Sequence, residues 1–386
     1  MKRICLFKYL AVLAFFAVSC GSIKTQNNVT PQECDIENEG TRKFLEEVTY
    51  TDTTYTVSYA RDYKKNYGAN DKPLPVTISW EGGPADGIYL STSGQFNESS
   101  LKLDDAVFVN DSVSPARIYN LIPGQKYYYI VINNNKKVLK SGCVIPVGPL
   151  RWINGVADNV RDLGGWKVPG GHIAYGRLYR GARLSSRMKD SGKDIFLNQL
   201  GISVDLDLRG IKDSEANAGP VIEGAEYLKL PVEKNLGRGT GNTQELYQQA
   251  IRSIIGWLGE GRNVYFHCAG GADRTGSLAF LKEALLGVSE SDMSKDYELT
   301  TFGPSNTRLR NYRATQDETH ILYELITHLR KFGYPQVSSI NELAVRWATT
   351  RHSDSVDPLT MDEIEMLRKY LIVKDRATAR LLKFSP

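Results

Sequence analysis

The sequence has few of the residues that build disulfide frameworks or metal sites. Its 386 residues include only 5 Cys and 5 His. None of the cysteines has the paired Cys-x-x-Cys spacing of structural zinc sites, and a chain of this length buries full-sized cores without disulfide bonds. We therefore expect no metal ion and no other cofactor. Whether Cys34 and Cys143 pair is left open by the sequence, because spacing does not give their separation.

A large excess of charge of one sign is also absent. The chain has 48 Lys and Arg against 44 Asp and Glu, a formal net charge of +4. Three of the basic residues, Lys2, Arg3 and Lys8, lie in an N-terminal segment that we expect to be removed, which leaves about +1. A chain so close to neutral has no field for general nucleic-acid binding, so we expect no nucleic-acid partner.

Long apolar runs are missing except near the N-terminus. The nine-residue run 10–18 follows the three basic residues and is too short for a membrane-spanning helix of about 20 residues, so it is typical of a secretory signal. Residues 17–22, Ala-Val-Ser-Cys-Gly-Ser, resemble the lipobox of bacterial lipoproteins. This resemblance implies that residues 1–19 are a signal peptide and that Cys20 carries the lipid. The protein would then be exported and lipid-anchored to a membrane of the bacterial cell envelope. The alternative is an ordinary signal peptide with a chance cysteine.

The next two segments differ in composition and in hydrophobic periodicity. Residues 20–44 are polar and lack sustained periodicity, which predicts a tether. Residues 45–147 have short β-rich runs separated by turn residues, which predicts an all-β sandwich. The predicted strands are 49–59, 76–80, 87–91, 106–109, 117–121 and 127–132. Residues 118–129 resemble fibronectin type III domains near their tyrosine corner. That resemblance implies a fibronectin type III-like fold with Trp80 in its core, and we interpret the domain as a spacer.

From residue 148 to 386 strands alternate with amphipathic helices, which predicts an α/β domain with a mixed sheet flanked by helices. Gly287 and Gly333 are predicted to end two of the helices in the left-handed conformation. Two capping-box spacings begin at Ser339 and Thr360. The predicted strands are 178–180, 203–208, 226–230 and 263–267, and the predicted helices include 193–200, 243–258, 275–286 and 316–331.

One motif in this domain carries chemistry. Residues 263–276 read as a strand, a Cys-x5-Arg loop and a helix. Cys268 supplies a nucleophile, which must be a thiolate to react. The backbone N–H groups of a Gly-rich loop above a helix N-terminus bind phosphate oxygens and lower the pKa of the thiol. Arg274 adds a planar fork for two phosphate oxygens. The predicted phosphate-binding residues are Ala269, Gly270, Gly271, Ala272, Asp273 and Arg274.

Two neighbours of the loop complete the motif. His267 is expected to orient the loop through hydrogen bonds, and the Thr275 hydroxyl to stabilise the departing thiolate. A Walker A loop is excluded because it needs Gly-Lys-Ser/Thr, where this chain has Asp273, Arg274 and Thr275. The alternative of an inert buried cysteine explains neither the arginine at this spacing nor the strand, loop and helix around it.

The region from about 152 to 386 resembles the cysteine-based protein tyrosine phosphatase superfamily, in its branch of bacterial tyrosine and phosphoinositide phosphatases. Besides the loop, three blocks carry the resemblance: Asn-Val-Arg-Asp-Leu-Gly-Gly at 159–165, Leu-Tyr-Arg-Gly-Ala-Arg-Leu-Ser at 178–185, and a strand at 200–209 that ends in Asp-Leu-Arg. The resemblance implies phosphomonoester hydrolysis through a phosphocysteine intermediate. Protein phosphotyrosine is the expected substrate.

The sequence does not decide which residue donates the proton to the leaving group. The resemblance implies Asp273, directly before Arg274, whereas other members of the superfamily use an acid on a mobile loop, which corresponds here to Glu233. Asp207 is a third candidate, although we interpret it as an ion-pair partner that supports Arg209 or Arg274.

Two other functions also remain open. A phosphatase of inositol phosphates or phosphoinositides is the first, but such relatives often have Lys where this chain has Ala272. A catalytically silent phospho-ligand binder is the second, and an intact Cys268 argues against it. The cations that would add positive charge to the rim are Lys234, Arg238, Arg308, Arg310 and Arg313.

Overall fold

The computed structural model describes residues 22–24, 30–47, 59–97, 114–213, 219–239, 241–304, 308, 321–334 and 338–374. Contacts divide the chain into two compact units. The smaller comprises residues 1–30, 80–114 and 127–143, and the larger comprises residues 31–79, 115–126 and 144–386. The signal segment with Cys20, the predicted strand 106–109, most of 49–59, and the rim cations Arg310 and Arg313 lie outside the described residues.

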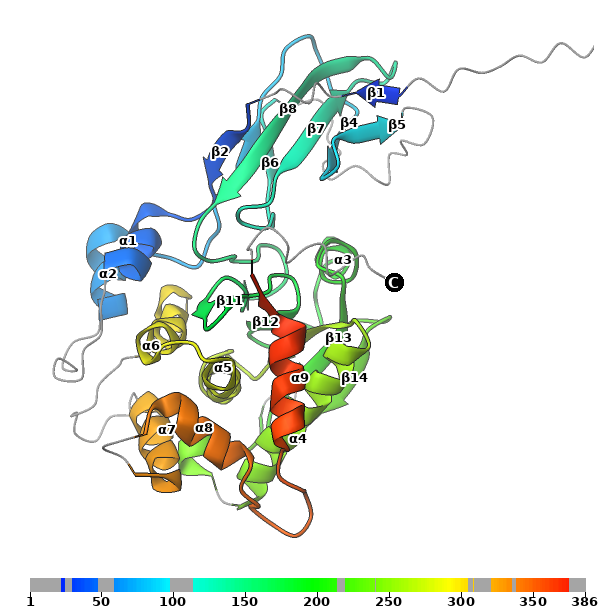
Figure 1. Cartoon of the computed structure of the whole chain (residues 1–386). Coiled ribbons are helices and arrows are strands. Elements are labelled where there is room, and N and C mark those ends of the chain that lie inside the picture. The colour runs from blue at the N-terminus through cyan, green and yellow to red at the C-terminus, as the bar shows by residue number, and fades with distance from the viewer. Residues whose placement is uncertain are drawn as a thin grey trace, which may run out of the picture. The chain divides into compact units, whose positions relative to one another are not determined.

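A five-stranded mixed sheet forms the centre of the larger unit (Figure 1). Its first four strands run parallel, and the fifth is antiparallel to its neighbour. His267, the last residue of β15, is paired with Asp207 on one side and Gly181 on the other. The carboxyl ends of three parallel strands therefore meet at one edge, where ligands bind in open α/β sheets. The strand order is β14 (Glu226–Lys229), β13 (Ile202–Asp207), β15 (Asn263–His267), β12 (Leu178–Gly181) and β9 (Arg161–Asp162).

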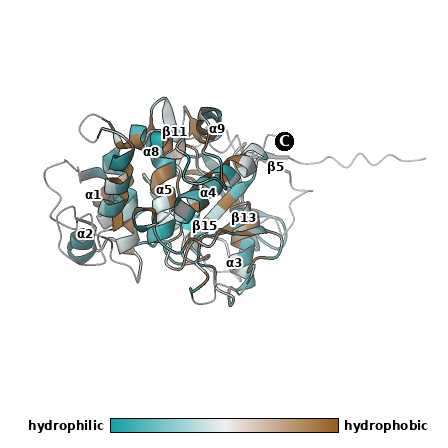
Figure 2. Cartoon of the chain, turned by 90° about the horizontal axis from the view of Figure 1, so that it is seen from below, coloured by the Kyte–Doolittle hydropathy of each residue, from teal (hydrophilic) through white to brown (hydrophobic). Residues whose placement is uncertain are grey.

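Both faces of this sheet are covered, because side chains alternate along each strand. Val264 and Phe266 belong to the core that contains helices α4 (Gly241–Gly259) and α5 (Asp273–Leu286). Tyr265, between them, belongs to a second core with Phe196, which lies on the π-helical turn Ile195–Gln199. Figure 2 shows the brown hydrophobic residues on α4, α5 and α9 (Met361–Leu371). The predicted mixed sheet flanked by helices is confirmed.

Most of the helix-end predictions hold. Gly287 ends α5 with φ +91°, and both capping boxes form, at Ser339 with Glu342 and at Thr360 with Glu363. Gly333 is the exception: it has φ −163°, which is extended, because a 3-10 turn over Arg330–Phe332 follows α7. The remaining helices of the described larger unit are α1 (Glu39–Glu47), α2 (Tyr59–Tyr67), α3 (Asp190–Asp194), α6 (Glu290–Glu298), α7 (Ile321–Leu329) and α8 (Ile340–Ala348).

The predicted tether over 20–44 is wrong for its second half. Residues Gln32–Asp35 form β2, which pairs in parallel with the end of β8 (Val138–Val147), and α1 follows at once. Phe44 on α1 is fully buried, with its ring 5.2 Å from that of Phe302. The helix is only nine residues long and has just two large apolar residues, Phe44 and Leu45, so its pattern is too short to predict a helix.

The predicted fibronectin type III-like sandwich over 45–147 is not confirmed. Predicted strands at 76–80, 87–91, 117–121 and 127–132 are present as β3 (Val76–Ile78), β4 (Gly87–Ser91), β6 (Ala116–Ile118) and β7 (Tyr127–Ile132). They pair in separate small sheets, however, and residues 59–67, for which a helix was not expected, form α2.

The smaller unit is a small β structure. Strands β4 and β7 pair antiparallel over Gly87–Ser91, and the described strand β1 (Ser22–Lys24) pairs with β5 (Gln95–Asn97). Tyr89, Phe96, Ile130 and Ile132 form its core, and Trp80 is buried as predicted. Across the described part of the chain, the helices are too short or too polar to span a membrane.

Candidate active site

The Cys-x5-Arg loop connects the carboxyl end of β15 to the first turn of α5. Cys268 directly follows His267, the last residue of β15, and Asp273 and Arg274 begin the helix. The Cys268 side chain is buried. Burial raises the pKa of its thiol, but the Arg274 guanidinium and the hydroxyl and N–H of Thr275 outweigh that effect, so the pKa is lower than usual. The thiol is therefore activated as a nucleophile.

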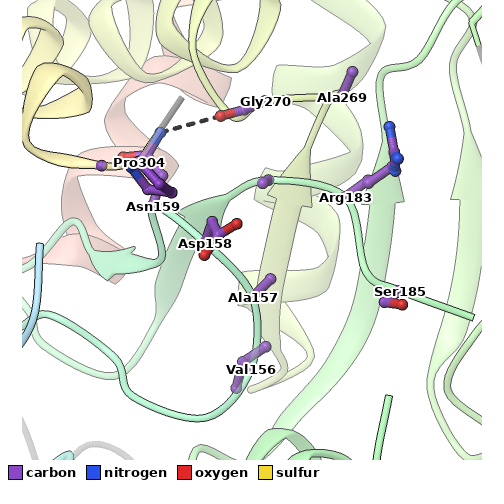
Figure 3. Close-up of a pocket in the computed structure, with 11 residues that line it drawn as sticks. Val156, Ala157, Asp158, Asn159, Arg183, Ser185, Ala269, Gly270 and Pro304 are labelled. Atoms are coloured by element: carbon purple, nitrogen blue, oxygen red, sulfur yellow. Dashed lines mark hydrogen bonds between the residues drawn. The ribbon is translucent and has the colours of Figure 1, made fainter. Parts of the chain in front are cut away.

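Four consecutive carbonyl oxygens of the loop are held by donors outside it. The Cys268 oxygen accepts from His267 Nδ1 at 3.1 Å, and the Ala269 oxygen accepts from the Arg183 N–H at 3.1 Å. The Gly270 and Gly271 oxygens each accept from Asn159 Nδ2 at 3.2 Å. Figure 3 shows the contact between Asn159 and Gly270.

These contacts fix the direction of the loop's N–H groups. In a planar trans peptide the N–H points opposite to the preceding carbonyl. The N–H groups of residues 269–272 therefore point away from the surrounding donors. Successive N–H groups on one side of a short loop above a helix N-terminus form an anion site. The predicted phosphate cradle thus has the required backbone direction.

His267 is part of this support. Its Nε2 lies 3.0 Å from Asp205 Oδ1 on the neighbouring strand β13, and its ring stacks on that of Tyr265. Burial lowers the pKa of His267, but Asp205, Asp207 and the Cys268 carbonyl outweigh it, and the pKa is raised. The imidazole therefore links the Cys268 carbonyl to Asp205 on β13, which holds this end of the loop against the sheet.

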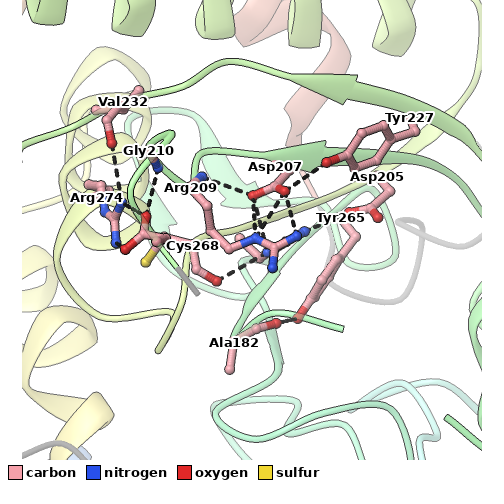
Figure 4. Close-up of polar contacts among 12 residues, drawn as sticks. Ala182, Asp205, Asp207, Arg209, Gly210, Tyr227, Val232, Tyr265, Cys268 and Arg274 are labelled. Atoms are coloured by element: carbon pink, nitrogen blue, oxygen red, sulfur yellow. Dashed lines mark hydrogen bonds and ion pairs between the residues drawn. The ribbon is translucent and has the colours of Figure 1, made fainter. Parts of the chain in front are cut away.

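Arg274 is oriented by a residue that the sequence analysis missed. Its Nη1 and Nη2 bind the two carboxylate oxygens of Asp213, and Nη1 also donates to the Val232 carbonyl at 3.2 Å (Figure 4). Asp213 in turn accepts from the Gly210 N–H at 2.7 Å. Both contacts engage the Nη end of the guanidinium. These contacts do not use the edge formed by Nε and the second N–H of Nη2, and such an edge is what bidentate phosphate binding requires.

Asp207 serves Arg209, as we interpreted. Both of its oxygens accept from Arg209, at 2.7–3.0 Å, and Tyr227 donates to it at 2.8 Å (Figure 4). Burial raises the pKa of Asp207, but the Arg209 hydrogen bonds and the nearby His267 outweigh it, so the pKa is lowered. A buried carboxylate held ionised in this way is a poor proton donor.

The two remaining acid candidates lie in one cavity with Arg274. Asp273 forms a bidentate pair with Arg308, with both distances 2.6 Å, and accepts from the Tyr297 hydroxyl at 3.2 Å. Glu233 accepts from the Ile211 N–H at 2.8 Å. The cavity has a volume of about 610 Å³ and is lined by Asp213, Glu233, Lys234, Asn235, Arg238, Asp273, Arg274, Arg308 and Ile321.

A second cavity lies on the other flank of the loop. It has a volume of about 550 Å³ and includes Ala269 and Gly270 of the loop in its lining. Figure 3 shows Asp158, Arg183 and Ser185 around it. The loop is therefore accessible from two sides, one rich in charge and one with mixed polar and small side chains.

Most of the predicted site residues therefore meet at one end of the sheet. Asp213 was missed because a lone aspartate in a Gly-containing loop has no local pattern. Asn159 and Arg180 were noted only as parts of motif blocks. Within the described residues no cluster of His, Cys, Asp and Glu suits a metal ion, and Cys34, Cys143 and Cys268 are free thiols.

An activated thiol, a backbone anion cradle and a fixed arginine on a mixed α/β sheet define the class of cysteine-based phosphatases. The comparison with known families agrees with this class, since residues 154–344 match the model described as tyrosine phosphatase family. This part of the chain is therefore similar to tyrosine phosphatases.

Individual relatives are distant. A Cupriavidus necator protein, whose name assigns it provisionally to the tyrosine-protein phosphatases, is 30% identical over 165 residues; the match covers 36% of this chain and 59% of that protein. The crystal structure of Pseudomonas aeruginosa TpbA has 18% identity and a TM-score of 0.30, and covers 46% of this chain and 91% of TpbA. The catalytic domain of Saccharomyces cerevisiae SIW14, titled a PP-IP phosphatase, has 17% identity and a TM-score of 0.28, with coverage of 36% and 79%.

The loop geometry predicts that Gly271→Ala abolishes most of the activity. Gly271 has φ +67°, and a Cβ there would lie 2.7 Å from the Ala182 nitrogen, so the loop must move. Displacing cradle donors costs about 10²- to 10³-fold in kcat. Steady-state kinetics with p-nitrophenyl phosphate measures the loss.

Gly261→Ala is the matched control. Gly261 has φ +79° but no atom within 4 Å of the added Cβ, and it lies in the turn between α4 and β15. Strain there should lower the free energy of unfolding by about 1 kcal/mol and leave kcat unchanged. Equal kcat losses in the two variants would contradict the role given to Gly271.

Proposed function

We propose that this protein hydrolyses phosphate monoesters, with protein phosphotyrosine as its main substrate. The observation that carries the proposal is the loop around Cys268: a thiol of lowered pKa at the centre of a backbone cradle, next to an arginine held in place by Asp213. The family description of the matching segment, tyrosine phosphatase, supports the phosphotyrosine part.

The reaction proceeds in two displacements. The Cys268 thiolate attacks phosphorus, the bond from phosphorus to the ester oxygen breaks, and an acid donates a proton to the leaving oxygen. Water then attacks the phosphocysteine, and the phosphorus–sulfur bond breaks, which regenerates the thiolate and releases phosphate. The backbone N–H groups and Arg274 stabilise the charge in both transition states. Thr275 stabilises the thiolate as it departs.

For the proton donor we propose Asp273, since it lies beside Arg274 at the start of α5. Its pair with Arg308 occupies both carboxylate oxygens, so this role requires the pair to open when substrate binds. Glu233 is the alternative. It lines the same cavity and accepts a hydrogen bond from the Ile211 N–H at 2.8 Å.

A phosphatase of inositol phosphates is the second candidate function. The observation in its favour is that Lys234, Arg238 and Arg308 line the cavity that contains Arg274. Additional phosphates on a ring would meet these cations. Two of them already have acidic partners, because Arg238 binds Glu324 and Arg308 binds Asp273. This competition favours a substrate with a single phosphate. The silent phospho-ligand binder is disfavoured because a binder has no use for an activated thiol.

The location of the enzyme is a further part of the proposal. The lipobox-like segment around Cys20 supports export and a lipid anchor in the bacterial envelope. The N-terminal residues up to about 147 would then hold the enzyme domain at a distance from the membrane.

Cys268→Ser tests the mechanism together with a substrate panel. We expect no turnover, because serine lacks the low pKa of the thiol, while inorganic vanadate still binds to the cradle and Arg274. Wild-type protein should prefer a phosphotyrosine peptide over a phosphoserine peptide and over inositol phosphates. Activity of the serine variant within tenfold of wild type, or activity that requires a metal ion, contradicts the thiolate mechanism.

Leaving-group dependence identifies the acid. Asp273→Asn should lower kcat by about 10²- to 10⁴-fold on a phosphotyrosine peptide and far less on p-nitrophenyl phosphate, whose leaving group needs no proton. Because a general acid acts only when protonated, the decline of activity at high pH should disappear. The rise at low pH should remain, since it reports the Cys268 thiolate. Glu233→Gln, the control, should affect both substrates equally and less; the reverse pattern assigns the acid to Glu233.

Cys20→Ala tests the anchor. We expect the variant, expressed with its signal segment in a bacterium, to move from the membrane to the soluble fraction, because the acyl chains are lost. Fractionation after a high-salt wash measures this, with Cys34→Ala as the control that stays in the membrane fraction. A Cys20→Ala variant that remains with the membrane would refute the lipid anchor.

A further inference from the structure

A buried group of charges lies behind the phosphate loop, away from Cys268. Asp296 on α6 is buried between Arg161 and Arg180, both of which are 0% exposed. Arg161 donates to Asp296 Oδ1 at 2.8 Å and to its carbonyl oxygen at 2.6 Å, and Arg180 donates to Oδ2 at 2.5 Å. One carboxylate therefore fixes two arginines that come from neighbouring strands, β9 and β12.

Both arginines lead to the loop. Arg180 uses Nη2 to donate to the Gly271 oxygen at 3.0 Å. Arg161 uses Nη1 to bind Asn159 Oδ1 at 2.7 Å, which turns the Asn159 amide so that Nδ2 faces the Gly270 and Gly271 oxygens. Asn159 has φ +56°, a conformation that asparagine tolerates better than most residues. Asp296 thus reaches two loop carbonyls through two separate routes.

The charge balance of this group favours an anion on the loop. Burial raises the pKa of Glu283 well above its usual value and lowers that of Lys282 well below its usual value, so it disfavours the charged form of both side chains. Burial lowers the pKa of Arg161 to about 10, which leaves it charged. Two arginines against one carboxylate leave a net positive charge behind the peptides that face the phosphate.

We propose that Asp296 is a positioning residue for the phosphate loop, and that it acts through Arg161 and Arg180 to hold the Gly271 and Ala272 N–H groups toward the bound phosphate. This inference rests on the proposed function and adds residues that do not touch the substrate. Buried ion pairs often contribute little to stability, since desolvation offsets their attraction. The contacts to the loop give this group a role beyond stability.

A matched ion pair exists in the same domain. Asp162 is buried and binds Arg151 at 2.9 Å, and it accepts N–H groups of Gly164 and Gly176. None of these partners belongs to the phosphate loop. Asp162→Asn therefore removes a buried carboxylate that is paired with an arginine, as Asp296→Asn does, without loosening the loop.

The experiment compares Asp296→Asn, Arg180→Lys and Asp162→Asn with wild type. We expect Asp296→Asn to lower kcat on p-nitrophenyl phosphate by about 10- to 100-fold and to weaken inhibition by inorganic vanadate by roughly tenfold, because cradle donors are misaligned. Arg180→Lys keeps the positive charge, but an ammonium lacks the planar guanidinium geometry that contacts Asp296 and the Gly271 carbonyl together. We therefore expect smaller decreases in kcat and in vanadate inhibition than for Asp296→Asn. Asp162→Asn should lose similar stability in urea unfolding yet keep kcat and vanadate inhibition within about twofold of wild type.

Each outcome decides the proposal. Equal kinetic losses in the Asp296 and Asp162 variants would show that Asp296 acts only on stability. If Asp296→Asn does not fold, Arg180→Lys carries the test, and wild-type vanadate affinity in that variant overturns the positioning role. If wild-type protein hydrolyses no phosphomonoester, vanadate affinity measured by calorimetry still separates the variants, and the proposed function fails alone. Wild type that neither binds vanadate nor hydrolyses any ester overturns both.

Discussion

The site depends on one constraint, the outward anchoring of the carbonyl oxygens of the loop after β15. A free loop of this composition has many conformations, and only one directs its N–H groups together toward an anion. His267, the Arg183 backbone, Asn159 and Arg180 each hold a carbonyl, and peptide planarity converts those contacts into a cradle. Phosphate therefore meets donors that are already aligned, which is the condition for strong electrostatic catalysis.

The sheet explains how residues far apart in the chain reach this loop. Parallel pairing of β12, β13 and β15 brings Gly181, Asp207 and His267 into register at one edge. Each strand then continues into a loop that contributes to the site: Arg183 after β12, Asp213 after β13 and Cys268 after β15. Insertions elsewhere, such as α1 and α2, pack on the larger unit without entering this edge. The site residues therefore come from the loops after the parallel strands, whereas α1 and α2 contribute buried side chains to the core.

Three carboxylates in the site are each paired with an arginine, and each pairing limits which other groups these side chains can bind. Asp213 occupies one end of the Arg274 guanidinium, Arg209 occupies Asp207, and Arg308 occupies Asp273. Of these carboxylates, Asp207 is committed to a structural role by burial and three donors. Asp273 and Glu233 instead line the same cavity as Arg274. If either is the acid of the proposed reaction, its present contacts must open first. The phosphate cradle itself needs no such rearrangement.

The sequence by itself determined the chemistry and the central strands, because both are local. A Cys-x5-Arg loop between a strand and a helix requires neighbouring residues only, and each of the strands β12 to β15 begins one or two residues after a glycine. Tertiary structure alone decided the partners. Asp213 lies 61 positions from its partner Arg274, Asp296 lies 116 positions from Arg180, and Arg308 lies 35 positions from Asp273. No local sequence pattern relates these partners. The tether prediction is wrong where β2 and α1 form, and the helix α2 lies inside the segment predicted as a sandwich. These elements are stabilised by contacts with distant segments, which composition and periodicity do not encode.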